Sequence, residues 1–228
     1  MSRTPLGQSP EVAALLARAR VIPVLTVEQP MTAVPLARAL VAGGLAVLEI
    51  TLRTDAALAA ASAIMAEVEG AVVGIGTVLT AAEMRAAGAA GARFAVSPGA
   101  SASLLDAAAD AGMPYLPGAA TASEIQALLE RGYSHLKFFP AESLGGVAAL
   151  RALAAPFRQV RFCPTGGIDA AKAKNYLALD AVPAVGGSWV APADRVAARD
   201  WAAVTELARQ ATTLGRPRSP AEIPEKSV

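Results

Sequence analysis

Residues 47–53 read Val-Leu-Glu-Ile-Thr-Leu-Arg, a run in which aliphatic and polar side chains alternate. Successive side chains of a β-strand point to opposite faces, so Glu49, Thr51 and Arg53 share one face and the aliphatic residues between them share the other. An aliphatic face of this kind packs against helices. The polar face is then typical of a barrel strand, which points a carboxylate, a hydroxyl and a guanidinium into or above the barrel mouth. A structural ion pair is the alternative.

Short runs rich in β-branched residues recur at intervals of roughly 20 to 26 residues, the spacing of βα units. The eight runs are residues 21–27, 47–53, 72–78, 94–99, 114–119, 135–140, 161–167 and 181–189. Ala- and Leu-rich segments with a helical period lie between them, including residues 31–42, 55–68, 80–90, 101–111, 121–131 and 147–154. Four of these segments begin at a residue that can cap a helix, namely Asp55, Thr80, Ser101 and Thr121. The alternation predicts an α/β fold, a single-domain (β/α)8 TIM barrel.

An open doubly wound sheet shares this alternation, but it normally carries a glycine-rich dinucleotide fingerprint after its first strand. Residues 24–28, Val-Leu-Thr-Val-Glu, show no such fingerprint, and a length of 228 residues suits one barrel. We expect an extra N-terminal helix across the barrel bottom in residues 1–20 and the catalytic barrel in residues 21–214. Residues 215–228 are expected to form a proline-rich tail.

The charge of the chain is nearly balanced, with 20 Lys and Arg against 19 Asp and Glu. A balanced surface has no field to recruit nucleic acid or an anionic membrane, so we expect small molecules or copies of the same chain as partners. No apolar stretch reaches the roughly 20 residues of a membrane span, and the N-terminal region does not resemble a signal peptide. Cys163 is the one cysteine, which excludes an internal disulfide and fits a reducing cytoplasm.

Residues 135–140, His-Leu-Lys-Phe-Phe-Pro, place Lys137 among large apolar side chains inside a predicted strand. A closed barrel has no sheet edges on which such a lysine could be exposed. Desolvation disfavours the ammonium and favours the free amine, which is the form that attacks a carbonyl carbon. Lys137 is therefore a candidate nucleophile, with a buried structural Lys–Glu pair as the alternative.

Two glycine pairs follow late strands, Gly166-Gly167 and Gly186-Gly187, and Ser188 comes directly after the second pair. In barrels, the loops after the seventh and eighth strands commonly bind phosphate together with a short extra helix, because glycine amides can approach an anion closely. One glycine pair alone more often marks a turn. Two pairs at these positions predict a phosphate site, to which Ser188 adds a hydroxyl donor.

Metal chemistry is not expected, because His135 is the one histidine and no set of His, Asp and Glu has metal-ligand spacing. We expect no metal and no cofactor. Cys163 lies inside a predicted strand beside Pro164, with no histidine near it in the sequence. We therefore expect it to be a core residue and not a nucleophile.

Seven ordered segments, which span about residues 11–212, resemble a known family of enzymes. The segments are residues 21–24 (VIPV), 48–54 (LEITLRT), 74–79 (GIGTVL), 97–99 (SPG), 137–142 (KFFPAE), 161–168 (RFCPTGGI) and 186–189 (GGSW). They resemble the class I 2-keto-3-deoxy-6-phosphogluconate (KDPG) aldolases of the Entner–Doudoroff pathway and the related 4-hydroxy-2-oxoglutarate (KHG) aldolases.

The resemblance implies that Lys137 forms a Schiff base with the keto carbon of the substrate and that Glu49 is the general acid and base. It implies further substrate contacts from Arg53, Thr77, Pro98, Phe139 and Thr165. The first two of these would hold the carboxylate end of pyruvate. A phosphate site would comprise Gly166, Gly167, Gly186, Gly187 and Ser188.

The reaction implied by the resemblance cleaves the phosphorylated keto acid 2-dehydro-3-deoxy-6-phosphogluconate to pyruvate and glyceraldehyde 3-phosphate. Family members commonly cleave 4-hydroxy-2-oxoglutarate to pyruvate and glyoxylate as well, and they are typically homotrimers. The nearest alternative is an aldolase for the galactonate-derived C4 epimer, which uses the same lysine chemistry. A phosphosugar epimerase or isomerase and a non-catalytic phosphate-binding module are the more distant alternatives.

Overall fold

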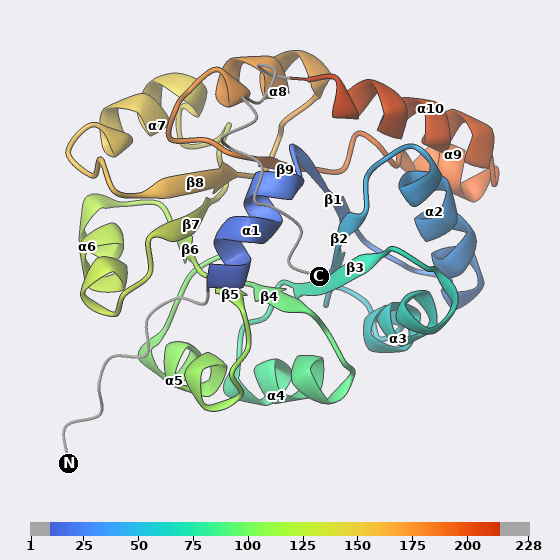
Figure 1. Ribbon diagram of the computed structural model, residues 1–228, viewed down its shortest axis with the longest axis horizontal. Coiled ribbons are helices and arrows are strands. Elements are labelled where there is room, and N and C mark those ends of the chain that lie inside the picture. Colours follow the sequence, from blue (N-terminus) through green and yellow to red (C-terminus); the bar gives the residue numbers. More distant parts are fainter. Residues whose placement is uncertain (1–9, 215–228) are drawn as a thin grey trace.

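The computed structural model describes residues 10–214, along which strands and helices alternate (Figure 1). The strands are β1 (Val21–Leu25), β2 (Val47–Thr51), β3 (Val72–Gly76), β4 (Phe94–Val96), β5 (Tyr115–Leu116), β6 (Gly118–Ala119), β7 (His135–Phe138), β8 (Arg161–Pro164) and β9 (Val185–Gly187). The helices are α1 (Pro10–Arg18), α2 (Pro30–Ala42), α3 (Ala57–Glu67), α4 (Ala81–Ala89), α5 (Ala102–Asp110), α6 (Ala122–Glu130), α7 (Gly146–Ala154), α8 (Ala170–Leu177), α9 (Ala193–Ala197) and α10 (Trp201–Thr212). The protein has an α/β fold in which helices surround a curled parallel sheet.

The strands of the described region form two parallel sheets. Six strands follow the order β5-β4-β3-β2-β1-β9, and three follow the order β6-β7-β8. Thr165, just after β8, forms a single bridge with Gly186 of β9. At the other end, Pro117 alone separates β5 from β6. The expected continuous strand at residues 114–119 is therefore wrong, because proline has no N–H group for the ladder.

The predicted strands extend too far toward their carboxyl ends. The ladder between β2 and β3 ends at the pair Thr51 and Gly76. Thr77, the next residue after β3, has a φ of 59°, which is not extended backbone. Arg53 consequently lies beyond the strand in which the sequence placed it. In the same way, Phe139 follows β7 and does not belong to it.

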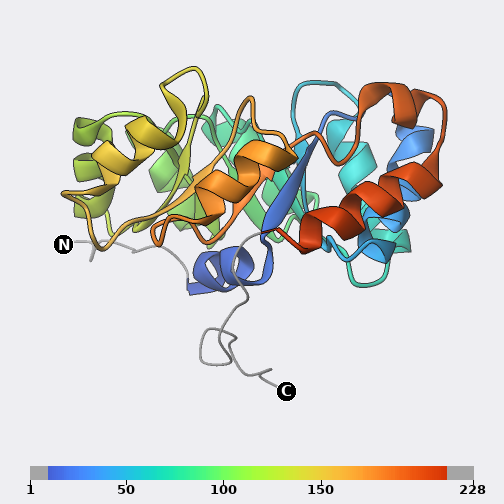
Figure 2. The same ribbon diagram turned by 90° about the horizontal axis from the view of Figure 1, so that it is seen from above.

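Two hydrophobic clusters lie on the two faces of the sheet. Leu48 and Ile50 of β2 belong to the larger cluster, which packs the strands against the surrounding helices. Val47, on the opposite face, belongs to a smaller cluster that also contains Val12 and Leu16 of α1. The predicted alternation within β2 is thus confirmed. Figure 2 shows α1 on one side of the curled sheet, where it adjoins the amino end of β1.

Helix capping follows the predicted residues at three of four positions. Thr80 and Thr121 form capping boxes with Glu83 and Glu124, and the Ser101 hydroxyl accepts the backbone N–H of Leu104. The prediction for Asp55 is wrong, because the cap position of α3 falls on Ala56, which makes no side-chain capping bond. None of the described helices is both long and apolar enough to cross a membrane. The expected tail at residues 215–228 lies outside the described residues.

Candidate active site

Lys137 of β7 and Glu49 of β2 face each other across the inner face of the sheet. The Lys137 Nζ lies 3.2 Å from the Glu49 Oε1, and the two side chains are 6% and 4% exposed. The structure therefore brings together the two residues to which the sequence assigned the chemistry. Burying two charges costs several kcal/mol per ion before their mutual attraction is counted. A buried ion pair with a purely structural role would therefore add little to the stability of the fold. A buried amine beside a carboxylate is instead the arrangement that nucleophilic and acid–base catalysis require.

Glycine on the neighbouring strand makes room for the Glu49 carboxylate. A Cβ atom added at Gly76 would lie 2.1 Å from the Glu49 Oε1, far inside van der Waals contact. Any larger residue at this position would displace the carboxylate from the lysine. No role was predicted for Gly76, although its place in the segment at residues 74–79 could have indicated one.

Lys137 contacts Phe139, and Phe139 lines a cavity. The Lys137 Nζ lies 5.3 Å from the centroid of the Phe139 ring, within the range of a cation–π contact. Phe139 also lines a cavity of about 690 Å³. The predicted site residues that line this cavity are Arg53, Phe139, Thr165, Gly166, Gly167, Gly187 and Ser188. These residues come from the carboxyl ends of several strands, where barrels carry their active sites.

Five predicted site residues do not line this cavity, namely the buried pair Lys137 and Glu49, and Gly186, Thr77 and Pro98. Gly186 is buried within β9, where an added Cβ would lie 2.4 Å from the Thr165 Oγ1, so its observed role is to leave space for Thr165. Thr77 and Pro98 follow β3 and β4. The loop at Pro98 is held by the buried hydroxyl of Ser97, which hydrogen-bonds to the Tyr115 hydroxyl and to the Gly99 carbonyl.

The sequence analysis missed polar and charged residues that the structure adds to the cavity wall. Thr26, Glu28 and Arg199 all line it. The Thr26 hydroxyl lies 3.1 Å from the hydroxyl of Thr51, on the inner face of β2. Thr26 and Glu28 directly follow the first strand, and this position could have identified them. Arg199 lies in the turn between α9 and α10, far along the chain, and nothing in the local pattern singled it out.

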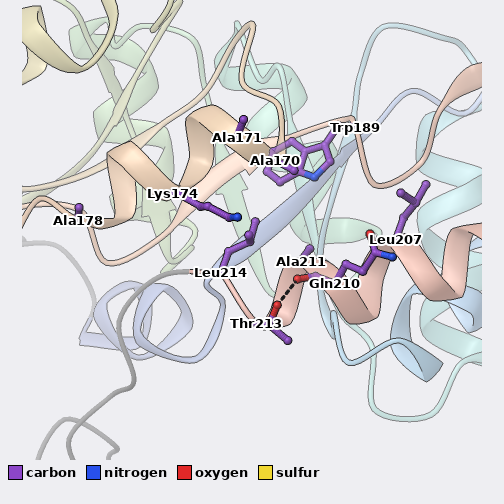
Figure 3. A pocket seen from close by; sticks show the side chains of 10 residues that line it. All are labelled: Ala170, Ala171, Lys174, Ala178, Trp189, Leu207, Gln210, Ala211, Thr213 and Leu214. Carbon is purple, nitrogen blue, oxygen red and sulfur yellow. Dashed lines mark hydrogen bonds between the residues drawn. The ribbon is translucent and has the colours of Figure 1, made fainter.

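A second cavity of about 730 Å³ lies between α8 and α10 (Figure 3). Its lining consists of Ala170, Ala171, Lys174, Ala178, Trp189, Leu207, Gln210, Ala211, Thr213 and Leu214. No predicted site residue belongs to this set. The buried Lys–Glu pair therefore identifies the first cavity, and not the slightly larger second one, as the candidate active site.

Cys163 pairs in register with Lys137 but has the character of a core residue, as predicted. Burial is the largest cause that raises the pKa of its thiol to about 12, and the nearby charge of Glu49 acts in the same direction. Lys137 and a hydrogen bond with Thr165 have the opposite, smaller effect. The thiolate that a nucleophilic cysteine needs is thus strongly disfavoured near neutral pH. Within residues 10–214, no group of three His, Cys, Asp or Glu side chains could hold a metal ion.

Comparison with known proteins agrees with this geometry. The sequence profile of the KDPG and KHG aldolases matches residues 12–207. The KHG/KDPG aldolase of Escherichia coli is 50% identical over 197 residues, which cover 86% of this chain and 92% of that protein. The structure of the 2-keto-3-deoxy-6-phosphogluconate aldolase of Zymomonas mobilis with 3-phosphoglycerate superposes with a TM-score of 0.87 at 48% identity, covering 91% of this chain and 97% of that one.

A third similar protein is a KDPG aldolase from Legionella pneumophila, whose structure holds pyruvate captured at low pH as a covalent carbinolamine intermediate. It is 41% identical, with a TM-score of 0.84, and the match covers 92% of this chain and 98% of that one. The profile and the relative from E. coli each extend over most of the chain. The chain belongs to the family of KDPG and KHG aldolases.

Proposed function

We propose that the protein is a class I aldolase that cleaves 2-dehydro-3-deoxy-6-phosphogluconate to pyruvate and glyceraldehyde 3-phosphate. The observation that carries this proposal is the buried Lys137 Nζ, 3.2 Å from the Glu49 Oε1 and beside the cavity wall at Phe139. Family membership supports the reaction. The carbinolamine of pyruvate in the relative from L. pneumophila supports covalent chemistry through an amine.

Lys137 is the proposed nucleophile. The Lys137 ammonium first passes a proton to the Glu49 carboxylate, 3.2 Å away. The free amine then attacks the C2 keto carbon of the substrate and forms a carbinolamine. The carbinolamine hydroxyl takes the proton back from Glu49 and leaves as water, which gives a protonated imine and restores the Glu49 carboxylate. The imine nitrogen carries a positive charge and accepts the electron pair that is released when the C3–C4 bond breaks. A neutral imine would be a poor electron sink, so the site must stabilise the cation, and the adjacent Glu49 carboxylate is placed to do so.

Glu49 is the proposed general acid and base. As a carboxylate it takes the proton of the C4 hydroxyl, and the C3–C4 bond breaks to release glyceraldehyde 3-phosphate and leave an enamine on Lys137. As a carboxylic acid it then returns the proton to C3 of the enamine. Hydrolysis of the resulting imine releases pyruvate and frees the lysine. One carboxylate beside Lys137 can serve both proton transfers because they occur in sequence.

The remaining predicted residues are proposed to bind the two ends of the substrate. Arg53 and Thr77 hold the pyruvoyl carboxylate, Pro98 and Phe139 shape the pocket, and Thr165 contacts the substrate chain. Gly166, Gly167, Gly186, Gly187 and Ser188 form the phosphate site. The cavity lining supports seven of these assignments. For Thr77 and Pro98 the support is the resemblance to the family, and for Gly186 it is contact with Thr165.

The finer architectural predictions are proposed on the same basis. We propose that the curled sheet closes into one (β/α)8 barrel in residues 21–214, with β5 and β6 as the two halves of a single strand. The bridge between Thr165 and Gly186 and the short break at Pro117 support closure. The described part of the expected N-terminal segment, α1 (Pro10–Arg18), then covers the barrel bottom, and residues 1–9 lie outside the described residues. A homotrimer in the cytoplasm and activity toward 4-hydroxy-2-oxoglutarate are expectations from the family.

A coupled assay of pyruvate release tests this proposal on both C4 epimers of the phosphorylated keto acid and on 4-hydroxy-2-oxoglutarate. We expect the highest kcat/KM for the gluconate-derived epimer. Glu49→Gln should lower kcat by about 10²-fold to 10⁴-fold, the range of general acid–base catalysis. A preference for the galactonate-derived epimer would favour the sister aldolase. Release of pyruvate from none of the three would point to an epimerase or a binding module.

A further inference from the structure

Arg199 adopts a backbone conformation that glycine normally occupies. It follows Ala198, the C-cap of α9, and has a φ of 55°. The residue after a helix C-cap is commonly glycine in this left-handed conformation, because a Cβ atom is disfavoured there. Four other helices of this chain follow that rule with Gly44, Gly91, Gly112 and Gly132, whose φ values are 95°, 86°, 60° and 82°. An arginine in this disfavoured backbone conformation therefore suggests that its side chain has a function.

The backbone around Arg199 is fixed by hydrogen bonds that any residue could make. Its N–H donates to the Val196 carbonyl at 3.0 Å, and its carbonyl accepts from the N–H of Trp201 at 2.9 Å. Neither bond involves the guanidinium. A glycine would make both bonds without strain, so the turn itself does not require arginine.

The Arg199 side chain lines the cavity of the candidate active site and lacks a strong partner. Its Nη2 lies 3.3 Å from the Met31 Sδ, which is a weak acceptor. It forms no ion pair with any residue between 10 and 214. Arg195, on the preceding helix α9, instead pairs with Asp200 at 3.0 Å. The guanidinium of Arg199 thus keeps donors available for an anion in the cavity.

The charged residues that line the cavity are Arg53, Arg199 and Glu28, so cations outnumber anions. Arg53 comes just after β2, the strand that carries Glu49, and is the residue proposed above for the pyruvoyl carboxylate. Arg199 follows β9 and Ser188 in the chain and lines the same cavity as Ser188 of the proposed phosphate site. A guanidinium suits a phosphate because two parallel N–H groups can bind two oxygens.

We propose that Arg199 binds the phosphate group of the substrate and determines the preference for phosphorylated over unphosphorylated keto acids. This inference rests on the proposed aldolase function. It adds a cation to the end of the substrate site that binds the phosphate. The left-handed backbone sets the direction of the side chain at the cavity wall. Arg199 takes no part in the chemistry at Lys137, which concerns the opposite end of the substrate.

The test compares wild type, Arg199→Gly and Arg199→Lys in two assays. The first measures kcat and KM for the phosphorylated substrate. The second measures the pyruvate concentration that gives half-maximal borohydride trapping, since pyruvate has no phosphate. Arg195→Ala is the matched control, because it removes a nearby arginine, on α9, that does not line the cavity.

Arg199→Gly should lower kcat/KM for the phosphorylated substrate by about 10-fold to 100-fold, mainly through KM, as expected for loss of a charge-assisted hydrogen bond. Half-maximal trapping by pyruvate should shift less than about 2-fold, and the Tm should be unchanged or higher. Arg199→Lys should recover part of the loss, and Arg195→Ala should match wild type. Equal effects on both assays, or no effect on either, would overturn the role of Arg199. Absence of trapping in wild type would instead refute the aldolase function.

Discussion

Gly76 leaves the space that the Glu49 carboxylate occupies beside Lys137. Gly76→Ala would place a carbon 2.1 Å from the Glu49 Oε1, so the carboxylate must leave the position beside Lys137. We expect kcat to fall at least about 10-fold, and overpacking to lower the free energy of unfolding by about 1–3 kcal/mol. Steady-state kinetics and urea denaturation measure the two effects.

Gly88→Ala is the matched control for this substitution. Gly88 lies on the exposed side of α4, and an added Cβ would meet the Met113 Cε at an ordinary 3.5 Å. Alanine in a helix is about 0.5–1 kcal/mol more stable than glycine, so this variant should be more stable and fully active. Full activity of Gly76→Ala would contradict the account of the Glu49 pocket.

The sequence predicted the central pair of the site and seven residues of the cavity wall, but it did not predict Gly76 or Arg199. Alternation in residues 47–53 put Glu49 on the inner face, and apolar neighbours put Lys137 in a strand. Both inferences use the period of a strand, which is local. Arg199 reaches the cavity through the turn that follows α9, and Gly76 matters because of a neighbour on another strand. Such relations depend on tertiary structure, which local patterns do not encode.

At the scale of elements, the capping box of α6 has a measurable pH dependence. The Glu124 carboxylate accepts the backbone N–H groups of Ala120 and Thr121 at 2.8 and 2.9 Å. The bond from Ala120 is the largest cause that lowers the pKa of Glu124, burial acts against it, and the bonds from Thr121 lower it further. A carboxyl group whose pKa is lowered by folding stabilises the protein at pH values above its unfolded-state pKa. This contribution is lost as the pH falls through its folded-state pKa.

Glu124→Ala should therefore cost about 1 kcal/mol near neutral pH, as is typical for a capping contact, and less as the pH falls below about 4. Glu130→Ala, in the last turn of the same helix, serves as the control because the Glu130 carboxylate forms no hydrogen bond or ion pair with any residue between 10 and 214. Urea denaturation at several pH values measures the difference between the variants. A cost for Glu124→Ala that does not change with pH would show that the carboxylate charge has no part in the cap.

The boundaries of the elements were predicted less well than their order. Thr80, Ser101 and Thr121 are caps as expected, because their side chains act on the next few residues. Asp55 is not a cap, since the chain between β2 and α3 turns for longer than the apolar period suggested. Strand ends were misplaced for a related reason. A strand ends where its partner ends, and the partner of β2 ends at Gly76.

At the scale of the molecule, the candidate site joins the two sheets. Glu49 belongs to the six-stranded sheet of the described region and Lys137 to the three-stranded one. The site can therefore exist only while both sheets keep their relative position. The number of βα units predicted a barrel, whereas the described strands form a six-stranded and a three-stranded sheet. A single bridge between Thr165 and Gly186 links the two sheets at one side, and Pro117 separates them at the other. The pattern along the chain could not show either feature.

We expect activity and global structure to be lost together in urea. If the sheets form one cooperative unit, the loss of activity and the change in fluorescence of Trp189 and Trp201 should have the same midpoint. Far-ultraviolet circular dichroism provides a third probe of the same transition. Loss of activity at a clearly lower urea concentration than the spectroscopic changes would mean that the two sheets separate before the chain unfolds.

The central claim is that Lys137 forms a covalent imine with a keto acid. The most direct test is borohydride reduction in the presence of pyruvate, followed by intact-mass and peptide analysis of wild type, Lys137→Ala and the control Lys174→Ala, which changes an exposed lysine of α8. We expect one pyruvyl adduct on Lys137 in wild type and in the control, and none in Lys137→Ala. An adduct that persists in folded Lys137→Ala, or its absence from wild type, would contradict the proposed mechanism.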